Sequence, residues 1–281
     1  MDKCKTKIMA ILNVTPDSFS DGGRFVDDNE QVNITSIMRC VEQMVKDGAD
    51  VIDIGGESTR PNAEYVDAAK EENRIIPVIQ AIKSNFDVEI SVDTYKASVA
   101  KTAFETGADI INDIGMMQLD NDMAKTVASL NSKYVLMHNI LVENGSSYRL
   151  SGSTATAMTE REYMDKTIKE LLAMIDSARN AGIEDKNIII DPGIGFNKSQ
   201  DENLWLMKNL SELCKLNYPV LLGCSRKSVI GNALVLPVDE RLEGTMATSV
   251  MAAMVGVSYI RVHDVKENFR AVKMAEAIMY S

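Results

Sequence analysis

The stretch QVNITSIMRCVEQMVKDGADVIDIGG (residues 31–56) contains one copy of the pattern that decides the fold. A β-branched run at 51–54 is typical of a buried strand, and the segment before it is amphipathic. Gly48 marks the end of the expected helix, because glycine tolerates the left-handed backbone found there. The apolar residues of this helix recur at three- and four-residue spacing: Ile34, Ile37, Met38, Val41, Met44 and Val45.

The same alternation of short apolar runs and longer amphipathic segments recurs along the chain. The runs of strand length number eight, at residues 8–12, 51–54, 88–92, 110–114, 134–137, 188–190, 220–222 and 259–262. Strands that alternate with helices predict a parallel sheet, and eight such strands close into a (β/α)8 TIM barrel of the α/β class. An open doubly wound sheet is the structural alternative, but the G-x-G-x-x-G expected after its first strand is absent.

Helix boundaries are also readable. Thr159 with Glu162 and Ser199 with Glu202 fit the capping box that opens a helix. Gly107 and Gly182, like Gly48, stand where a helix must end before the next strand. Nothing resembles a linker, so we expect residues 1–281 to form a single domain.

Composition narrows the class of protein. The chain has 281 residues, 45% of them hydrophobic, and a formal charge of −11. This charge argues against a non-specific nucleic-acid binder and against attachment to an anionic membrane. No apolar run approaches the roughly 20 residues of a membrane span. The four cysteines show no metal-binding spacing, which predicts reduced thiols and a cytoplasmic protein.

Polar residues follow nearly every expected strand, and in such a barrel these strand ends form the face that carries the chemistry. Asn or Asp at a strand-to-helix junction is often only an N-cap, which is the interpretation we favour for Asp264. Asp113 is expected only to orient its neighbours. Four residues lie in the strand ends themselves, where an unpaired polar group costs several kcal/mol and a ligand rich in N–H groups would offset it: Asn13, Asp93, Asn112 and Asp191.

The last two strands are followed by basic residues, at the usual phosphate-binding position of these barrels. In an acidic protein this cluster predicts an anionic ligand; its members are Arg226, Lys227, Arg261 and His263. The alternative is a group of solvated surface charges. We interpret His138, Cys224 and Trp205 as packing residues.

These features together resemble the bacterial dihydropteroate synthases. The resemblance spans residues 8–279 and is carried, in order, by ILNVTPDSFSDGG (11–23), DIGGESTRP (53–61), SVDT (91–94), IND (111–113), LMHN (136–139), DPGIGF (191–196), GCSRKS (223–228) and RVHD (261–264). It implies a pterin-binding barrel that condenses (7,8-dihydropterin-6-yl)methyl diphosphate with 4-aminobenzoate, giving dihydropteroate and pyrophosphate with Mg²⁺. It also implies a homodimer and competitive inhibition by sulfonamides.

The resemblance assigns roles position by position. Asp93, Asn112, Asp191 and Lys227 would bind the pterin, and Met137, Phe196, Gly223 and Val262 are further expected substrate-binding residues. Asn13, Arg261 and His263 would hold the diphosphate, Asn13 through the metal, with Asp17 as a second metal ligand. The aminobenzoate would lie against Thr59, Arg60, Pro61 and Ser228, under Phe19. The expected catalytic residues are Asp93, Asp191, Lys227, Arg261 and His263, acting in a dissociative substitution at the pterin methylene carbon.

Three departures from the family pattern affect loops. Asn62 replaces the usual glycine, Met116 and Met117 replace small residues, and 139–152 is a variable loop. Two alternatives stay open: a methyltetrahydrofolate-binding methyltransferase of the same barrel type, and a non-catalytic pterin-binding barrel. The first has no diphosphate to expel, and the second would be expected to have lost Asn13, Lys227, Arg261 or His263.

Overall fold

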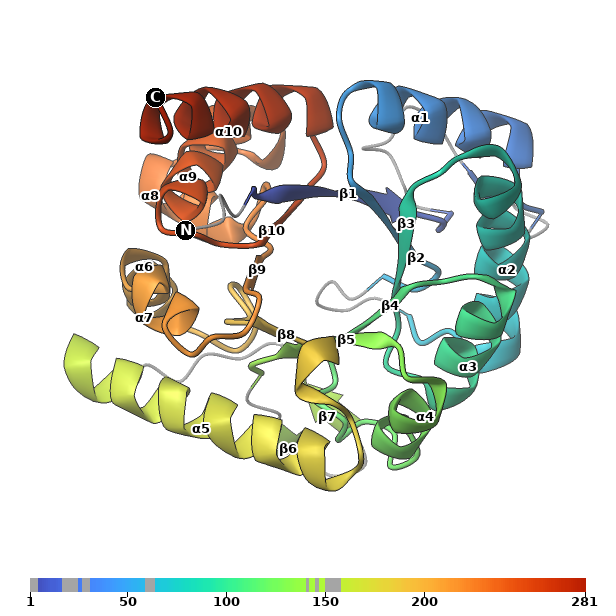
Figure 1. The fold of residues 1–281 in the computed structure, drawn as a ribbon, viewed down its shortest axis with the longest axis horizontal. Coiled ribbons are helices and arrows are strands. Elements are labelled where there is room, and N and C mark those ends of the chain that lie inside the picture. Colours follow the sequence, from blue (N-terminus) through green and yellow to red (C-terminus); the bar gives the residue numbers. More distant parts are fainter. Residues whose placement is uncertain are drawn as a thin grey trace.

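A computed structural model describes residues 5–16, 25–26, 31–58, 64–139, 142–144, 147–149 and 158–281. In this part of the chain, parallel strands form a ring that helices surround (Figure 1). Each predicted run corresponds to one strand of an eight-stranded sheet: β1 (Lys7–Asn13), β2 (Val51–Gly55), β3 (Glu89–Asp93), β4 (Ile110–Asp113), β5 (Lys133–Met137), β8 (Ile188–Asp191), β9 (Leu221–Leu222) and β10 (Tyr259–Val262).

The sheet closes almost completely. Its order is β8-β5-β4-β3-β2-β1-β10-β9, and neighbouring strands within it pair in parallel. The two ends meet through a bridge between Ile190 and Val220, where the Ile190 amide donates to the Pro219 carbonyl across 2.9 Å. The (β/α)8 prediction is therefore confirmed, and the open doubly wound alternative is wrong.

The helices lie outside the ring of strands (Figure 1). They are α1 (Ile34–Lys46), α2 (Ala68–Asn85), α3 (Ala97–Thr106), α4 (Met123–Leu130), α5 (Glu160–Asn180), α6 (Gln200–Lys208), α7 (Leu210–Cys214), α8 (Ser228–Leu234), α9 (Leu242–Met254) and α10 (Val265–Met279), with short 3-10 turns η2 (Asp185–Asn187) and η3 (Val238–Glu240). Among the described helices, none is both long and apolar enough to cross a membrane. An antiparallel pair, β6 (Val142–Asn144) and β7 (Ser147–Arg149), occupies part of the stretch that the sequence predicted only as a variable loop.

Local signals place the helix ends as predicted. Both capping boxes form: Thr159 and Glu162 open α5, and Ser199 and Glu202 open α6. The glycines expected to end helices all have positive φ, at 104° for Gly48, 128° for Gly107 and 99° for Gly182. These turns fix where each strand enters the barrel and therefore which side chains point inward.

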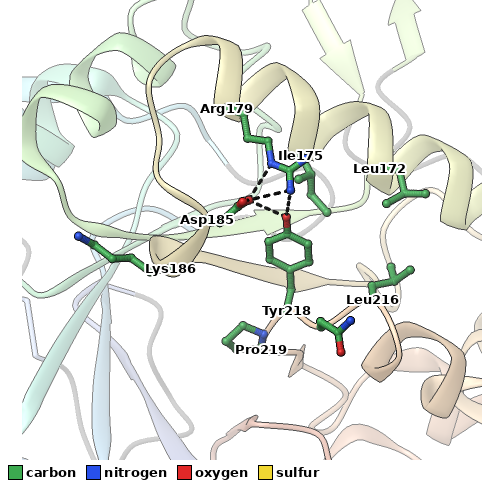
Figure 2. Close-up of a pocket in the computed structure, with 9 residues that line it drawn as sticks. Leu172, Ile175, Arg179, Asp185, Lys186, Leu216, Tyr218 and Pro219 are labelled. Carbon is green, nitrogen blue, oxygen red and sulfur yellow. Dashed lines mark hydrogen bonds and ion pairs between the residues drawn. The ribbon is translucent and has the colours of Figure 1, made fainter.

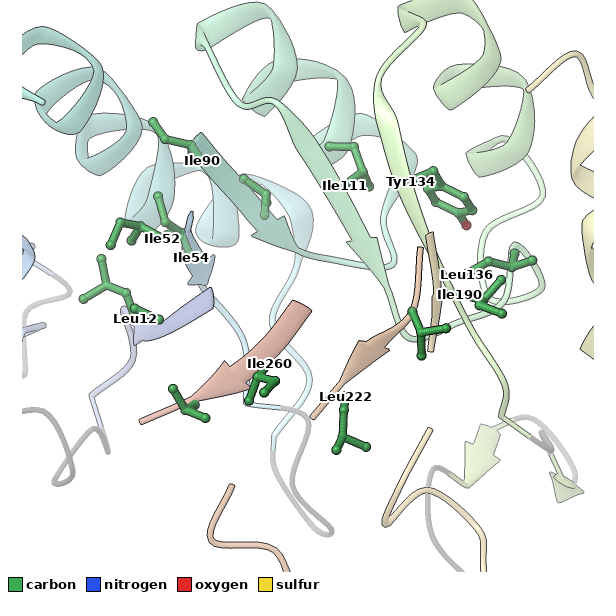
Figure 3. Close-up of a cluster of buried hydrophobic side chains, with 14 of the residues drawn as sticks. Leu12, Ile52, Ile54, Ile90, Ile111, Tyr134, Leu136, Ile190, Leu222 and Ile260 are labelled. Carbon is green, nitrogen blue, oxygen red and sulfur yellow. The ribbon is translucent and has the colours of Figure 1, made fainter. Parts of the chain in front are cut away.

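The alternation of side chains along each strand separates two apolar cores. One core lies between strands and helices and includes Leu12, Ile52, Ile90, Ile111 and Ile260 (Figure 3). The other fills the barrel interior and consists of Met9, Val51, Ile110, Val135, Ile189, Leu221 and Tyr259. Since successive side chains face opposite sides of a strand, the residue two positions later also faces inward. That next inward layer is Ile11, Asp53, Asn112, Met137, Asp191, Gly223 and Arg261.

An ionic cluster lies near the other end of the barrel, where strands begin. Lys7 of β1 donates to Glu89 of β3 across 2.5 Å, and Lys133 of β5 forms an ion pair with the same carboxylate. Alternate strands thus supply this layer, as in other barrels of this type. The chemistry-bearing layer lies two levels above, at the carboxyl ends of the strands.

Candidate active site

The strand pairing itself brings predicted site residues into one row. Asn13 pairs with Gly55, Gly55 with Asp93, and Asp93 with Asn112, across β1 to β4. Gly55 has no side chain, and a Cβ there would lie 3.9 Å from Asn13 Oδ1 and 3.7 Å from Asp93 Cβ. The glycine therefore leaves a gap between the amide and the carboxylate at the barrel mouth.

Arg261 lies between two carboxylates inside the barrel. Its Nε donates to Asp53 Oδ2 across 2.6 Å, and its Nη2 donates to Asp93 Oδ2 across 2.8 Å. Asp53 is completely buried, and only 19% of the Arg261 side chain is exposed. The sequence predicted Arg261 and Asp93 as site residues but missed Asp53, which joins them.

Burial raises the pKa values of two strand-end aspartates, Asp93 and Asp191. Burial raises the pKa of Asp93 to about 7, while the Arg261 guanidinium acts in the opposite direction. Burial also raises the pKa of Asp191, against the positive charge of Lys227. Within the described residues, Asp93 Oδ1 has no hydrogen-bond partner. This side of the site is thus ready to accept hydrogen bonds from a ligand.

Lys227 approaches the same space from the segment after β9. Its Nζ donates to the Ile194 carbonyl across 2.6 Å and lies 4.6 Å from the centre of the Phe196 ring. Burial lowers the pKa of Lys227, and the nearby Asp191 carboxylate opposes that effect. A Cβ at Gly223 would lie 3.8 Å from Lys227 Nζ and 3.9 Å from Arg261 Cδ, so glycine leaves room between the two cations.

Lys198 supports this region and was not singled out from the sequence. Its buried Nζ donates to the carbonyls of His138 (2.8 Å), Gly193 (3.0 Å) and Phe196 (3.1 Å). An ammonium group has three N–H donors, so the three carbonyls match it. The Gly193 amide in turn donates to Asp191 Oδ1 across 2.7 Å. Lys198 therefore fixes the segment that carries Phe196 and supports Asp191.

Lys227 and Arg261 of the predicted basic cluster face the barrel interior, whereas Arg226 and His263 pair with other residues of the strand-end loops. Arg226 lies at the strand end as expected, but its guanidinium forms a two-point ion pair with Asp264. Asp264 occupies the N-cap position of α10, yet its side chain makes no capping hydrogen bond, because the carboxylate faces Arg226 instead. The cap interpretation was thus correct for position and wrong for the side chain. His263 is oriented differently, with Nδ1 3.0 Å from Ser225 Oγ.

The structure also places the other predicted site residues that lie within the described part of the chain. Met137 belongs to the inward layer and is buried. Val262 belongs to the outer apolar core, so its side chain points toward the helices and away from the barrel interior. Ser228 is exposed at the first position of α8, next to Lys227. Asp113 accepts a 2.5 Å hydrogen bond from the Tyr134 hydroxyl and bonds from the Gly115 and Met117 amides, so it orients its own loop as predicted.

Other predicted ligands lie outside the described residues, namely Asp17, Phe19, Thr59, Arg60 and Pro61, and so does the departure at Asn62. Of the two predicted metal ligands, Asn13 is therefore the one that the structure places. Among the described residues, no group of three or more His, Cys, Asp or Glu side chains is arranged to hold a metal ion. His138 and Cys224 are buried, in agreement with a packing role, and Trp205 packs at the edge of the core.

A separate groove lies near the opposite end of the barrel, beside the residues that precede β9. Figure 2 shows Arg179, Asp185 and Tyr218 linked in it, with the Tyr218 hydroxyl 2.6 Å from both partners. Arg179 lies near the end of α5, Asp185 begins η2, and Tyr218 lies in the segment before β9, so all three precede the amino ends of β8 and β9. The groove is therefore distinct from the layer that holds Asp191 and Arg261.

Comparison with known proteins finds the same architecture and sequence pattern. The sequence model of the family described as pterin binding enzyme matches residues 9–263. A dihydropteroate synthase of Clostridium beijerinckii is 48% identical over 276 residues, covering 98% of this chain and 95% of the relative. The solved Yersinia pestis dihydropteroate synthase in a sulfonamide drug complex has a TM-score of 0.87 and 37% identity, covering 100% of this chain and 97% of that one. The Coxiella burnetii dihydropteroate synthase in complex with pteroic acid has a TM-score of 0.83 and 39% identity, covering 98% and 93%.

Proposed function

The chain belongs to the pterin-binding enzyme family and, within it, to the dihydropteroate synthases, and we propose that the inward polar layer of its barrel carries the reaction. The enzyme condenses (7,8-dihydropterin-6-yl)methyl diphosphate with 4-aminobenzoate and releases pyrophosphate. The observation that carries this assignment is the convergence of Asp93, Asn112 and Asp191 with Lys227 and Arg261 at the carboxyl ends of the strands.

The acidic side of the layer suits the pterin ring. A pterin presents several N–H donors, and carboxylate and amide oxygens accept them. Asp93 Oδ1 is buried without a partner among the described residues, so a ligand N–H there would satisfy it. The Lys227 ammonium group lies over the Phe196 ring, and it would donate a hydrogen bond to an acceptor atom of the pterin ring. The solved Coxiella burnetii relative binds pteroic acid, which supports this part of the proposal.

The leaving diphosphate is assigned to Asn13 and His263, with Arg261 beside them. Asn13 offers an amide oxygen next to the gap at Gly55, and oxygen is the ligand type that Mg²⁺ prefers. Mg²⁺ usually keeps several waters and uses substrate phosphates, so a closed protein cage is not required. When bound, the ion would neutralise the charge that develops on departing pyrophosphate.

The protein's own groups favour a dissociative substitution at the pterin methylene carbon. As the C–O bond to diphosphate lengthens, positive charge spreads into the pterin, where Asp93 and Asp191 lie. Negative charge grows on the leaving group, toward His263 and Arg261. The aryl amine then attacks the carbon and loses its proton after the bond forms, so a strong general base is unnecessary.

The aminobenzoate is assigned to the outer part of the mouth. Ser228 is exposed beside Lys227, and Thr59, Arg60, Pro61 and Phe19 complete this site in the proposal. The Yersinia pestis relative forms a sulfonamide drug complex, which supports sulfonamides as competitive inhibitors here.

We also propose a homodimer formed by α9 and α10, which pack side by side (Figure 1). Met251, Met254, Met274 and Ile278 are each more than half exposed on these helices, and apolar surface of this kind marks protein interfaces. Light scattering should give twice the mass of the 30.9 kDa chain. We further propose one pterin-binding domain over residues 1–281 and a cytoplasmic location, where the thiols of Cys40, Cys214 and Cys224 stay reduced.

The two rival functions explain less of the site. A methyltetrahydrofolate-binding methyltransferase has no diphosphate to expel and no use for the combination of Asn13, Lys227 and His263. A non-catalytic pterin-binding barrel would not need to keep all of Asn13, Lys227, Arg261 and His263, and this chain has all four.

The direct test is pyrophosphate release by the purified full chain. Release should require the pterin diphosphate, 4-aminobenzoate and Mg²⁺ together, and a folded protein that releases none would contradict the assignment. Lys227→Ala and Asp191→Ala should abolish turnover. Lys186→Ala is a matched control, because Lys186 lines the groove near the opposite end of the barrel and pairs with Glu184. Unchanged kcat/KM in either site variant would refute its assigned role.

A further inference from the structure

Asp53 occupies an unusual place for a carboxylate. It lies in the middle of β2, has no solvent exposure, and belongs to the inward layer directly below the row of Asn13, Gly55 and Asp93. The proposed function gives Asp53 no contact with the substrate, because Asn13 of β1 and Asp93 of β3 lie closer to the barrel mouth. A fully buried carboxylate is costly unless its oxygens are paired with strong donors.

Two site residues provide those donors from different strands. Arg261 of β10 donates its Nε to Asp53 Oδ2 across 2.6 Å. Asn112 of β4 directs its Nδ2 at the same carboxylate, 3.4 Å from Oδ1 and 3.3 Å from Oδ2. Asp53 therefore connects the residue assigned to the pterin with the residue assigned to the diphosphate.

The chemistry of the pair fixes the orientation of the Asn112 amide. A carboxylate only accepts hydrogen bonds, so the amide must turn its NH₂ group toward Asp53 and its Oδ1 away from it. Arg261 strengthens this arrangement, because its charged donor holds the carboxylate in place. Asn112 then presents an acceptor, and not a donor, to whatever binds above the layer.

We propose that Asp53 is a positioning residue that selects the acceptor face of Asn112 and holds the Arg261 guanidinium, and thereby sets the recognition of the pterin ring. This inference rests on the proposed function, in which Asn112 accepts a hydrogen bond from the pterin. Asp53 acts through these two side chains without touching the substrate. Its removal should therefore weaken pterin binding far more than aminobenzoate binding.

Three variants of equal size test the proposal. Asp53→Asn removes the charge. The Asn112 amide can then rotate, so that its NH₂ group in place of its oxygen faces the ligand. Asn112→Asp places two carboxylates face to face. The combined Asp53→Asn, Asn112→Asp variant restores one carboxylate and one amide with the donor and acceptor exchanged, so an acceptor oxygen still faces the ligand. Ser91→Ala, a change at the buried partner of Asp53 in the β2–β3 register, is the control.

Steady-state kinetics on the full chain gives the readout. Each single variant should raise the KM for the pterin diphosphate at least tenfold, with less than a twofold change in the KM for 4-aminobenzoate. The combined variant should recover at least a third of the loss, on a logarithmic scale, that Asn112→Asp causes, and Ser91→Ala should match the wild type. A purely structural role would shift both KM values or neither, and would make the two changes additive.

Several results would overturn the inference. These are an unchanged pterin KM in Asp53→Asn, an equal rise in both KM values, or no recovery in the combined variant. Thermal unfolding is followed for every variant. If Asp53→Asn fails to fold, a folded combined variant still demonstrates the pairing, and an unfolded one contradicts it. A wild-type chain that releases no pyrophosphate refutes the proposed function instead, which separates the two failures.

Discussion

Arg261 donates its Nε–H to Asp53 across 2.6 Å, and Asp53 has no contact with solvent. The same guanidinium also binds Asp93, so one cation balances a fully buried carboxylate and a largely buried one. This arrangement links the stability of the barrel to the geometry of its site.

Arg261→Ala should therefore destabilise the protein as well as inactivate it. Removing one partner of a buried ion pair leaves the other charge uncompensated, which costs about 3–5 kcal/mol. Urea unfolding should show a loss of this size, and pyrophosphate release should fall below detection. Arg179→Ala is the control, since that arginine pairs with Asp185 on the surface, where solvent screens the charges, and it should leave the free energy of unfolding nearly unchanged. Equal effects of the two changes would contradict the role of Arg261.

Gly193→Ala should be far more damaging than Gly256→Ala. Both glycines have positive φ, 67° and 90°, which costs an alanine roughly 1–2 kcal/mol. A Cβ at Gly193 would also lie 2.0 Å from the His138 carbonyl oxygen, whereas one at Gly256 would meet nothing within 4 Å. Denaturant unfolding of both variants compares them. The expectation is a loss at Gly193 more than twice that at Gly256, with pterin binding impaired only in the first.

His138 should make the protein sensitive to mild acid. Burial lowers its pKa to about 4, from 6.5 in the unfolded chain. The unfolded state therefore binds the proton first, and stability present above pH 6.5 is lost as the pH falls toward 4, by at most about 3 kcal/mol. Asp93, whose pKa rises to about 7, acts in the opposite direction, so the comparison must be between variants.

His138→Gln should flatten the dependence of unfolding free energy on pH between 6.5 and 4, because glutamine can still donate to Glu170. His263→Gln is the control, since the chain has only two histidines and His263 is partly exposed. The same slope in His138→Gln and wild type would refute the prediction.

Asn13→Ala should raise the Mg²⁺ concentration needed for half-maximal activity by about tenfold or more, as loss of a metal-site oxygen commonly does. Calorimetric titration of Mg²⁺ with pyrophosphate present gives a readout independent of turnover. Asn85→Ala, at the end of α2, should leave the Mg²⁺ requirement unchanged. A wild-type Mg²⁺ affinity in Asn13→Ala would remove Asn13 from the metal site.

Sulfonamides should inhibit competitively against 4-aminobenzoate and not against the pterin diphosphate. The reason is that the proposed function assigns the aminobenzoate to the outer mouth and the pterin to the buried layer beneath it. Initial rates at varied concentrations of each substrate measure this directly. Inhibition that is relieved by excess pterin diphosphate alone would place the drug in the pterin pocket and contradict this prediction.

The repeated strand and helix signals made the barrel predictable from sequence. The runs around Ile52 and Ile260 combine strand length with β-branched residues, and several helix boundaries carry a cap or a glycine, as at Thr159 and Gly107. Local chemistry and global closure agree here, so the interpretation did not depend on any single position. The β6–β7 pair escaped because its short strands sit in a segment without a clear period.

The site was predictable where polar residues end a strand, and less so inside one. Asp53 was missed because it lies in an apolar run, although its place two residues after Val51 gives it the inward parity. The partner of Arg226 could not be read at all, since the pairing with Asp264 depends on a strand-end geometry that spacing does not encode. Lys198 was missed because its partners are backbone carbonyls, which leave no signature in the sequence.

Among the described residues, a single bridge between Ile190 and Val220 joins the two ends of the sheet and closes the barrel. Asp191 is the next residue after Ile190 in β8. This seam is held by fewer backbone bonds than the junctions between longer strands, so local opening is cheapest there. A ligand anchored on Asp191 would span the seam and hold its edges together. A ligand bound there would add contacts on both sides of the seam, and because it binds only the folded barrel it would raise the free energy of unfolding.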